Sequence, residues 1–289
     1  MSVASHTIIG FGAVGKALTR DLLTGGEEIC SVVTHRPARV NKLIVLPDDC
    51  EISNSFHQHS SEYPHFIWLT VPDDVIESKV DELLADSNIT LGDDTTFIHC
   101  SGSLGLDVLE KAKAMGFHVA SLHPLQTFSQ DVNEESLSAF KGIYASVLAG
   151  DDITQKRLNL LCSNLGVSPL LVSEREKKQI HLSAAIACNY LTTLLDIAQR
   201  QLPESGDFSI KIFEPLLKKT IEQNLRYGPS QALSGPVRRG DISTIKTHLE
   251  LLKNDDVVIY KVLGEKTLQL VSKMNSGHKN IQQIFRERE

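Results

Sequence analysis

The chain has 289 residues, of which 41% are hydrophobic and 22% are charged, and its formal net charge at pH 7 is -7. This length suffices for a full hydrophobic core and favours two domains. The lack of a basic surplus argues against a nucleic-acid partner, so the expected partners are a small molecule and a second copy of the chain. The first residues lack the pattern of a signal peptide, and no uninterrupted apolar run reaches the ~20 residues that cross a bilayer.

Cysteines and clustered histidines give no sign of a metal site. The five cysteines are widely spaced and form no CxxC pair, which favours reduced thiols and a cytoplasmic protein. His57, His59 and His65 lie in a polar stretch without a carboxylate or cysteine at ligand spacing. We interpret them as solvated surface residues, and no metal is expected.

Short apolar runs alternate with helical patterns in the first half of the chain. Strands are predicted over 7–9, 29–34, 66–71, 95–100, 118–122, 142–149 and 169–172, and helices over 15–23, 75–84, 106–115 and 153–165. Near-continuous apolar strands are typical of a parallel sheet that is covered on both faces. Their alternation with helices predicts an α/β fold with a Rossmann-type, doubly wound parallel sheet.

The character of the sequence changes near Ser173. Beyond this point we expect only helices, over 174–201, 210–227, 242–253 and 257–273. The predicted organisation is therefore a dinucleotide-binding domain over 1–173 and an all-α domain over 174–289.

A GxGxxG motif follows the first strand and opens the first helix. In this setting the first glycine permits a tight turn, the second lets the backbone approach a pyrophosphate, and the third allows close helix–strand packing. The alternative is a glycine-rich turn without a ligand. The predicted cofactor-contacting residues of the turn are Gly10, Phe11, Gly12, Ala13, Val14 and Gly15.

The end of the second strand predicts NADP rather than NAD. An NAD enzyme usually has an acidic residue there, which hydrogen-bonds the ribose hydroxyls. This chain instead has Thr34, His35 and Arg36, followed by Arg39. A guanidinium and a hydroxyl can bind a 2′-phosphate, whereas Arg39 could equally be a solvated surface residue. The missing acid also argues against a methyltransferase.

Other strand ends carry further candidates for the site. Thr70, Val71, Pro72 and Ser101 are expected to line the cofactor, and Asp73 is expected to cap the next helix.

Two histidines, His99 and His123, end neighbouring strands. A single such histidine is more often structural, but two beside small hydroxyl residues favour a polar substrate pocket.

The helical half contributes three more candidates, His181, Asn189 and Arg238. His181, Ala185 and Asn189 are spaced four apart, which places them on one face of a regular helix. Asn189 either bonds a neighbouring helix or faces a cofactor cleft together with His181. Arg238 lies in a turn framed by glycine and proline, where it could bind a substrate carboxylate or be solvated, and Asp241 is a natural N-cap.

Several segments together resemble one family. The family is that of Rossmann-like oxidoreductases with a DUF2520 C-terminal domain, and the resemblance covers nearly the whole chain. The segments that resemble it are GFGAVG, LTVPDD, HCSG, SLHPLQTF, HLSAAIACNY and GPVRRGD. That family is similar to pyrroline-5-carboxylate reductase, ketopantoate reductase, and the 6-phosphogluconate and 3-hydroxyacid dehydrogenases. The resemblance implies NADP binding, a helical domain that forms a homodimer, and a substrate cleft between the domains.

One departure from these relatives affects the predicted mechanism. The hydroxyacid dehydrogenases carry a lysine four residues before the helix asparagine, and this chain has Ala185 there. His123 and His181 are then the candidate proton donors, with Asn189 and Arg238 as candidate substrate ligands. The expected function is an NADP(H)-dependent oxidoreductase for a small polar carbonyl, imine or hydroxy compound. The missing lysine favours the alternative, a non-catalytic NADP-binding sensor or interaction protein.

Overall fold

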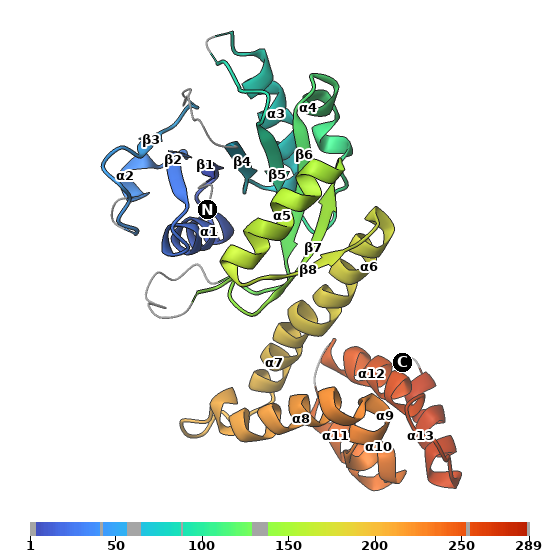
Figure 1. Cartoon of the computed structure of the whole chain (residues 1–289). Coiled ribbons are helices and arrows are strands. Elements are labelled where there is room, and N and C mark those ends of the chain that lie inside the picture. Colours follow the sequence, from blue (N-terminus) through green and yellow to red (C-terminus); the bar gives the residue numbers. More distant parts are fainter. Residues whose placement is uncertain are drawn as a thin grey trace. The chain divides into compact units, whose positions relative to one another are not determined.

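The protein forms two compact units, residues Met1–Ala185 and Ile186–Glu289. The structure is a computed structural model that describes residues 4–40, 43–56, 65–87, 89–128, 138–252 and 255–287. The first unit contains a sheet with helices around it, and the second is helical (Figure 1).

The first unit is built on an eight-stranded sheet of order β3-β2-β1-β4-β5-β6-β7-β8. Neighbouring strands from β3 to β6 run parallel, β7 is antiparallel to β6, and β8 is parallel to β7. The order of the first six strands is that of the dinucleotide-binding fold, so the predicted fold class is confirmed. The strands are β1 Ser5–Ile9, β2 Glu28–Val33, β3 Glu51–Ser53, β4 His65–Leu69, β5 Thr96–His99, β6 His118–Pro124, β7 Tyr144–Ala149 and β8 Ser168–Leu171.

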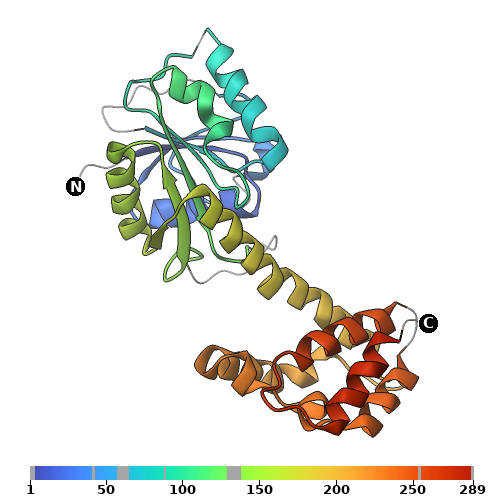
Figure 2. The same ribbon diagram turned by 90° about the vertical axis from the view of Figure 1, so that its right-hand side faces the viewer.

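Helices cover both faces of this sheet. They are α1 Ala13–Thr24, α2 Pro37–Val40, α3 Ile76–Ala85, α4 Glu110–Ala114, α5 Asp152–Leu165 and α6 Glu174–Ala184, with 3-10 turns η1 Asp73–Val75 and η2 Asp107–Leu109. Figure 2 shows α3 and α4 on one side of the sheet and α5 on the other. Apolar strand residues are therefore buried on both faces, as the near-continuous apolar runs predicted.

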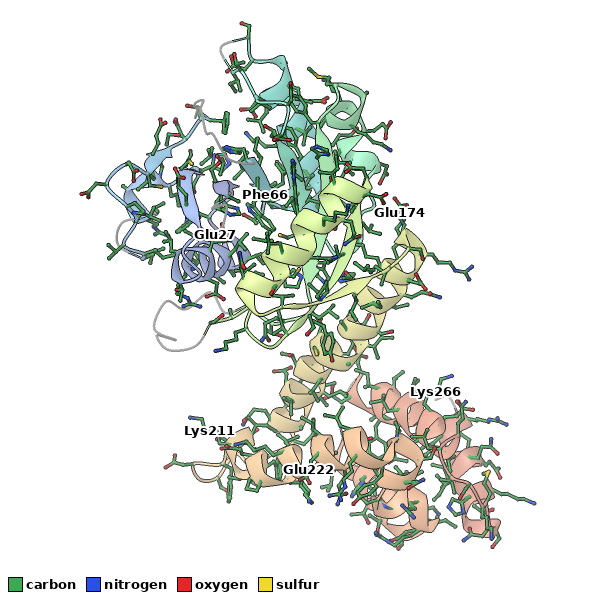
Figure 3. All side chains as sticks on the ribbon, in the orientation of Figure 1. Glu27, Phe66, Glu174, Lys211, Glu222 and Lys266 are labelled. Carbon is green, nitrogen blue, oxygen red and sulfur yellow. The ribbon has the colours of Figure 1, made fainter. Side chains whose placement is uncertain are left out.

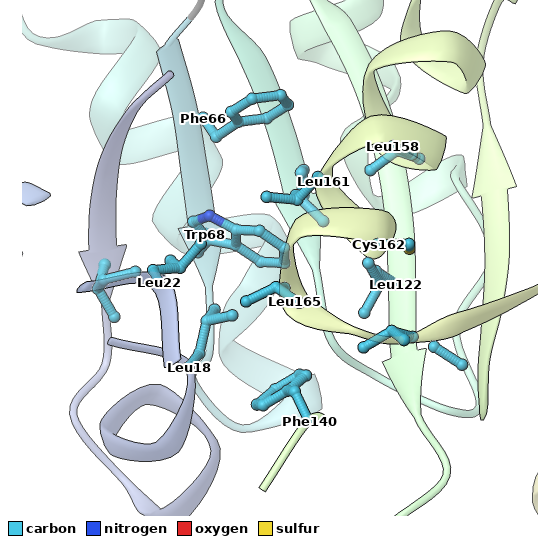
Figure 4. Close-up of a cluster of buried hydrophobic side chains, with 14 of the residues drawn as sticks. Leu18, Leu22, Phe66, Trp68, Leu122, Phe140, Leu158, Leu161, Cys162 and Leu165 are labelled. Carbon is cyan, nitrogen blue, oxygen red and sulfur yellow. The ribbon is translucent and has the colours of Figure 1, made fainter. Parts of the chain in front are cut away.

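Each face of the sheet has its own hydrophobic cluster. On one face Phe66, labelled in Figure 3, and Trp68 of β4 pack with Leu18 of α1 and Leu161 of α5 (Figure 4). The cluster on the other face gathers side chains of α3, α4 and the strands, with Phe97 among them.

One sequence prediction about the histidines is wrong. His65 is the first residue of β4 and is buried, because Ser5 and Thr7 of the neighbouring β1 supply hydroxyl groups 3.2 and 2.9 Å from its ring nitrogens. Such partners make a buried imidazole tolerable. His57 and His59 lie outside the described residues.

The described part of the second unit contains helices and no strand. They are α7 Tyr190–Arg200, η4 Ile210–Phe213, α8 Glu214–Tyr227, α9 Pro229–Ala232, α10 Gly235–Arg239, α11 Ile242–Leu251, α12 Asp256–Leu268 and α13 Ser276–Arg286. Its buried apolar cluster consists of Ile245, Leu268, Ile281 and Phe285. This core is small for a unit of that length.

The helix α6 lies in the first unit, although the sequence placed it in the second domain. The capping box of Ser173 and Glu176 begins α6, and side chains of α6 hydrogen-bond the turn after β5. A π-helical turn, η3 Ala185–Asn189, joins α6 to α7.

The continuous stretch Glu174–Arg200 has the length and composition of a membrane span, with 27 residues and a mean hydropathy of 1.3 in its most apolar window. Length and composition alone are weak evidence of a span, and the α6 part contributes a buried lysine to the first unit.

Candidate functional site

The candidate site lies in the first unit, along one edge of the sheet. The strands β1, β2, β4, β5 and β6 run in the same direction, so their carboxyl ends meet there, where ligands of such sheets bind. The residues that follow or end these strands are Gly10, Thr34, Thr70, Cys100 and His123.

The three motif glycines have different structural roles. Gly10 has a φ of +97°, and a Cβ atom on it would lie 2.7 Å from the Thr70 carbonyl oxygen. A Cβ atom on Gly15 would overlap the Gly10 carbonyl. In contrast, a Cβ atom on Gly12 would meet no heavy atom within 4 Å. Two glycines are thus needed for packing, while Gly12 leaves open space beside the backbone, as a dinucleotide-binding turn requires.

The first turn of α1 is suited to an anion. Gly12 is its N-cap, no side chain caps the helix, and the first turn has no acidic residue. The free N–H groups and the helix dipole therefore favour a negative group at this end. Ala13 and Val14 begin the helix, and Phe11 packs against the core cluster, so what this turn presents is mainly backbone.

The residues after β2 suit the 2′-phosphate of NADP better than the two ribose hydroxyls of NAD. His35 and Arg36 are exposed, and the Thr34 hydroxyl accepts a bond of 3.4 Å from the Arg36 backbone N–H. Within the described part of the chain, the Arg36 guanidinium makes no hydrogen bond or ion pair. It therefore keeps all its donors for a ligand.

Asp73 does not cap the helix that follows β4, so that prediction is wrong. Its carboxylate instead accepts bonds from the hydroxyls of Ser101, at 2.7 Å, and Ser103, at 2.8 Å. The Ser101 hydroxyl in turn accepts from the backbone N–H groups of Ser103 and Leu104. Ser101 is thus engaged in shaping the turn after β5, next to the loop that carries Thr70, Val71 and Pro72.

His123 and His181 lie together in the first unit. Their ring centroids are 5.2 Å apart and the rings meet edge to face. A Cβ atom on Gly102 would lie 2.8 Å from His123 Nε2 and would overlap His181 Nδ1. Only a glycine at position 102 allows both imidazoles to approach the turn so closely.

The hydrogen bonding of His123 fixes its tautomer. Its Nδ1 lies 2.9 Å from the Cys100 carbonyl oxygen, which can only accept, so Nδ1 carries the proton and Nε2 has the free lone pair. Burial lowers the pKa of His123, and the charge of Lys177 acts in the same direction, while the bond to the Cys100 carbonyl and the carboxylate of Asp73 act in the opposite one. His123 Nε2 is thus a proton acceptor at neutral pH.

His99 has a structural role instead. It is fully buried, and its Nε2 donates to the Gly105 carbonyl oxygen at 2.8 Å. Burial, assisted by the charge of Lys177, lowers the pKa of His99 to about 4. A neutral, enclosed imidazole of this kind supports the turn and has no access to a ligand.

Sequence reasoning missed two charged residues of α6 at this site, Glu174 and Lys177. Lys177 is 1% exposed, and its ammonium donates to the Leu104 carbonyl oxygen at 2.5 Å. The available signal was its spacing, because Lys177 precedes His181 by four residues and so shares its helix face.

Two predicted site residues belong to the second unit. Asn189 is exposed and ends the π-helical turn, whose wider bonding interrupts the regular spacing assumed from His181 onward. Arg238 donates to the carbonyl oxygens of Gln231 and Leu233. The predicted N-cap role of Asp241 is confirmed by its bond to the Thr244 N–H.

Comparison with known families supports the resemblance predicted from the sequence. Residues 143–267 match the family described as domain of unknown function DUF2520. No protein of curated function matches the chain.

Similar solved structures share the fold. A candidate NADP oxidoreductase from Bacteroides fragilis is 22% identical, with a TM-score of 0.71 over 92% of this chain and 98% of that one. A Thermotoga maritima protein is 20% identical, with a TM-score of 0.71 over 93% and 100% of the two chains. The 1-pyrroline-5-carboxylate reductase of Streptococcus pyogenes is 13% identical, with a TM-score of 0.55 over 98% and 97%. These similarities confirm the Rossmann-type fold that the sequence predicted.

Proposed function

We propose that this protein is an NADP(H)-dependent oxidoreductase acting on a small polar carbonyl, imine or hydroxy compound. The observation that carries the proposal is the open space at Gly12, at an uncapped helix N-terminus on the ligand-binding edge of the sheet. Arg36 at the end of β2 favours the phosphorylated cofactor. The names of the similar structures, an NADP oxidoreductase and a pyrroline carboxylate reductase, point to the same chemistry.

The cofactor would supply the hydride chemistry, and the chain would supply binding, orientation and proton transfer. The glycine turn would hold the pyrophosphate, and Arg36 with Thr34 would hold the 2′-phosphate. His123 Nε2, which has the free lone pair, would accept the proton of a substrate hydroxyl while the two electrons leave as hydride. In the reductive direction the protonated ring would return that proton.

The cofactor assignment is tested by measuring the Kd of NADPH and NADH by isothermal titration calorimetry. We expect NADPH to bind more tightly than NADH. Arg36→Ala should lower the affinity for NADPH by roughly tenfold or more and change the affinity for NADH little, because a charge-assisted bond to the 2′-phosphate is lost. Arg175→Ala, at an exposed position of α6 in the same unit, is the control. Equal affinity for the two cofactors in the native protein would contradict the assignment.

The acid–base assignment is tested with a panel of carbonyl, imine and hydroxy compounds, following NADPH absorbance. Once a substrate is found, His123→Ala is expected to lower kcat by about 10²–10⁴-fold, and His181→Ala to lower it as well. His248→Ala in the second unit, where the ring bonds Tyr260, is the control. Full activity in both site variants would exclude proton transfer by these residues. Tight NADPH binding without turnover on any compound would favour the sensor alternative.

We also infer that a second copy of this chain covers apolar surface of the second unit. Its buried cluster has four members, while Tyr190, Leu216, Leu225 and Val258 are all at least 60% exposed. A unit that exposes this much apolar surface gains stability by association, and most oligomers of soluble proteins are symmetric assemblies of one chain.

Size-exclusion chromatography with light scattering tests this inference. The native protein is expected to have twice the mass of the chain. Leu225→Glu or Tyr190→Glu should shift the measured mass toward that of a single chain. Leu160→Glu on the exposed face of α5 in the first unit is the control. A native protein of single-chain mass at micromolar concentration would refute the dimer.

A further inference from the structure

Lys177 is among the largest fully buried side chains of the protein. Enclosing an ammonium group is unfavourable unless bonds and opposite charges compensate for the lost hydration. The ammonium donates to the Leu104 carbonyl oxygen, and the side chain is buried. The geometry therefore favours an effect on the site through the residues that Lys177 contacts.

The turn 104–106 is held from three sides. Lys177 donates to the Leu104 carbonyl oxygen, and His99 of β5 donates to that of Gly105. The carboxylate of Glu174, labelled at the beginning of α6 in Figure 3, accepts from the Leu106 N–H at 3.2 Å. A Cβ atom on Gly105 would lie 2.5 Å from Glu174 Oε1, so helix and turn are in close contact. The pair of α6 side chains thus binds one donor and one acceptor of the same short turn.

This attachment also sets the place of His181. Lys177 and His181 are one helical turn apart and share a face of α6. The turn that Lys177 holds begins two residues after Gly102, where His181 and His123 lie close to the backbone. A shift of α6 relative to the turn would move His181 away from His123.

We propose that Lys177 is a positioning residue that ties α6 to the turn after β5 and so holds His181 against His123 across Gly102, with its charge acting on the His123 imidazole. The functional meaning of this role rests on the proposed acid–base function of the two histidines. The geometric and electrostatic parts do not depend on it.

The electrostatic part follows from the groups around Lys177. Burial lowers the pKa of Lys177 to about 8, while the carboxylates of Asp73 and Glu174 act in the opposite direction and the charge of Lys178 in the same one. Below that pH the ammonium is charged, and its field disfavours a second positive charge on His99 or His123. Burial raises the pKa of Cys100 to about 12, so that thiol is neutral and does not offset the field. For His123 this field adds to the effect of burial, which is the largest cause of its lowered pKa, while the bond to the Cys100 carbonyl and the carboxylate of Asp73 act in the opposite direction.

The test is an NMR titration of the His123 imidazole, which needs no substrate. Lys177→Met removes the charge at similar length, and we expect the pKa of His123 to rise by about half a unit to one unit. Lys177→Arg keeps the charge and should leave the pKa of His123 near its native value. Lys178→Met, at the exposed neighbouring position of α6, should also leave the pKa of His123 unchanged. An unchanged His123 pKa in folded Lys177→Met would overturn the electrostatic part.

The geometric part has a separate readout in the same spectra. We expect cross-relaxation between the His123 and His181 rings in the native protein and its loss in Lys177→Met, and its persistence there would overturn the positioning role. If Lys177→Met does not fold, the native protein still provides a test, because the His123 signals should show a second inflection near pH 8 when Lys177 loses its proton. Absence of that inflection would refute the coupling. Loss of catalysis in His123→Ala alone would bear on the proposed function and not on this result.

Discussion

The two units of the protein differ in how completely each encloses its own apolar residues. The first unit has buried clusters on both faces of its sheet, and several of their large side chains are fully buried: Trp68, Phe97, Leu18 and Ile76. The second unit encloses one small cluster around Ile245. Most of the large apolar side chains that remain exposed belong to the second unit.

This difference follows from the architecture of each unit. A parallel sheet is flanked by its own crossover helices, so one chain buries both faces. A set of amphipathic helices joined by short turns buries one stripe of each helix and leaves other stripes uncovered unless another surface packs on them. The first unit is therefore expected to be stable by itself, whereas the second is expected to depend on association.

The largest effect should come from the core of the first unit. Leu161→Ala in α5, a position 3% exposed, should lower the free energy of unfolding by about 2–5 kcal/mol. Trp68 is the single tryptophan and is fully buried, so urea unfolding followed by its fluorescence reports on this unit alone. Leu160→Ala, 56% exposed in the same helix, is the control and should change the value by less than about 0.5 kcal/mol. Similar losses in the two variants would contradict a self-contained core.

Acid should destabilise the first unit by a comparable amount. Burial lowers the pKa of His99 to about 4, and it also lowers the pKa of His6. Between the ordinary histidine pKa of about 6.5 and the folded value, the unfolded chain binds protons that the folded chain does not, so stability falls as the pH decreases through this window. His99 alone should contribute about 3 kcal/mol between pH 6.5 and pH 4.

Tryptophan-detected urea unfolding at a series of pH values measures this slope. His99→Gln keeps a donor for the Gly105 carbonyl and should flatten the slope, whereas His35→Gln, at an exposed position, should not. A stability that is constant from pH 6.5 to pH 4 would show that His99 titrates normally.

A smaller effect should distinguish the second unit. If association stabilises it, its unfolding free energy should rise by about 1.4 kcal/mol for each tenfold increase in protein concentration. The helical circular dichroism should then lose part of its signal at a urea midpoint that depends on concentration, while the Trp68 fluorescence midpoint changes less. Coincident transitions at all concentrations would mean that the two units unfold together and that the contrast between them has no energetic consequence.

The sequence predicted the parts of the fold that depend on local pattern. The apolar runs identified β1, β2 and β4 to β8, and the glycine spacing identified the turn before α1. The strand β3 escaped notice, because three residues with one apolar side chain carry no periodic signal. The helix α13 was also missed, although Asn275 and His278 form a capping box at its start.

The site was less predictable, because its key contacts are distant in sequence. Asp73 meets Ser101 and Ser103 only after β4 and β5 have paired, so a local rule assigned it to helix capping. In the sequence, Lys177 is one of several charged residues in the first turn of a predicted helix, and only its contact with Leu104 places it inside the unit. Whether a charged residue is buried depends on which backbone group the fold brings to it.

The smallest stability effect should arise at Gly12, the one motif glycine beside open space. Its φ of -80° and ψ of -162° suit any residue, and a Cβ atom would touch nothing within 4 Å, so Gly12→Ala should change the unfolding free energy by less than about 1 kcal/mol. If that space admits a pyrophosphate, the added methyl group should nevertheless lower the affinity for NADPH by about tenfold or more, since it displaces the anion from the helix N-terminus. Gly92→Ala, which also meets no atom within 4 Å but lies outside this turn, should change neither quantity. Unaltered NADPH affinity in a stable Gly12→Ala protein would mean that this gap in an otherwise closed unit is not where the cofactor binds.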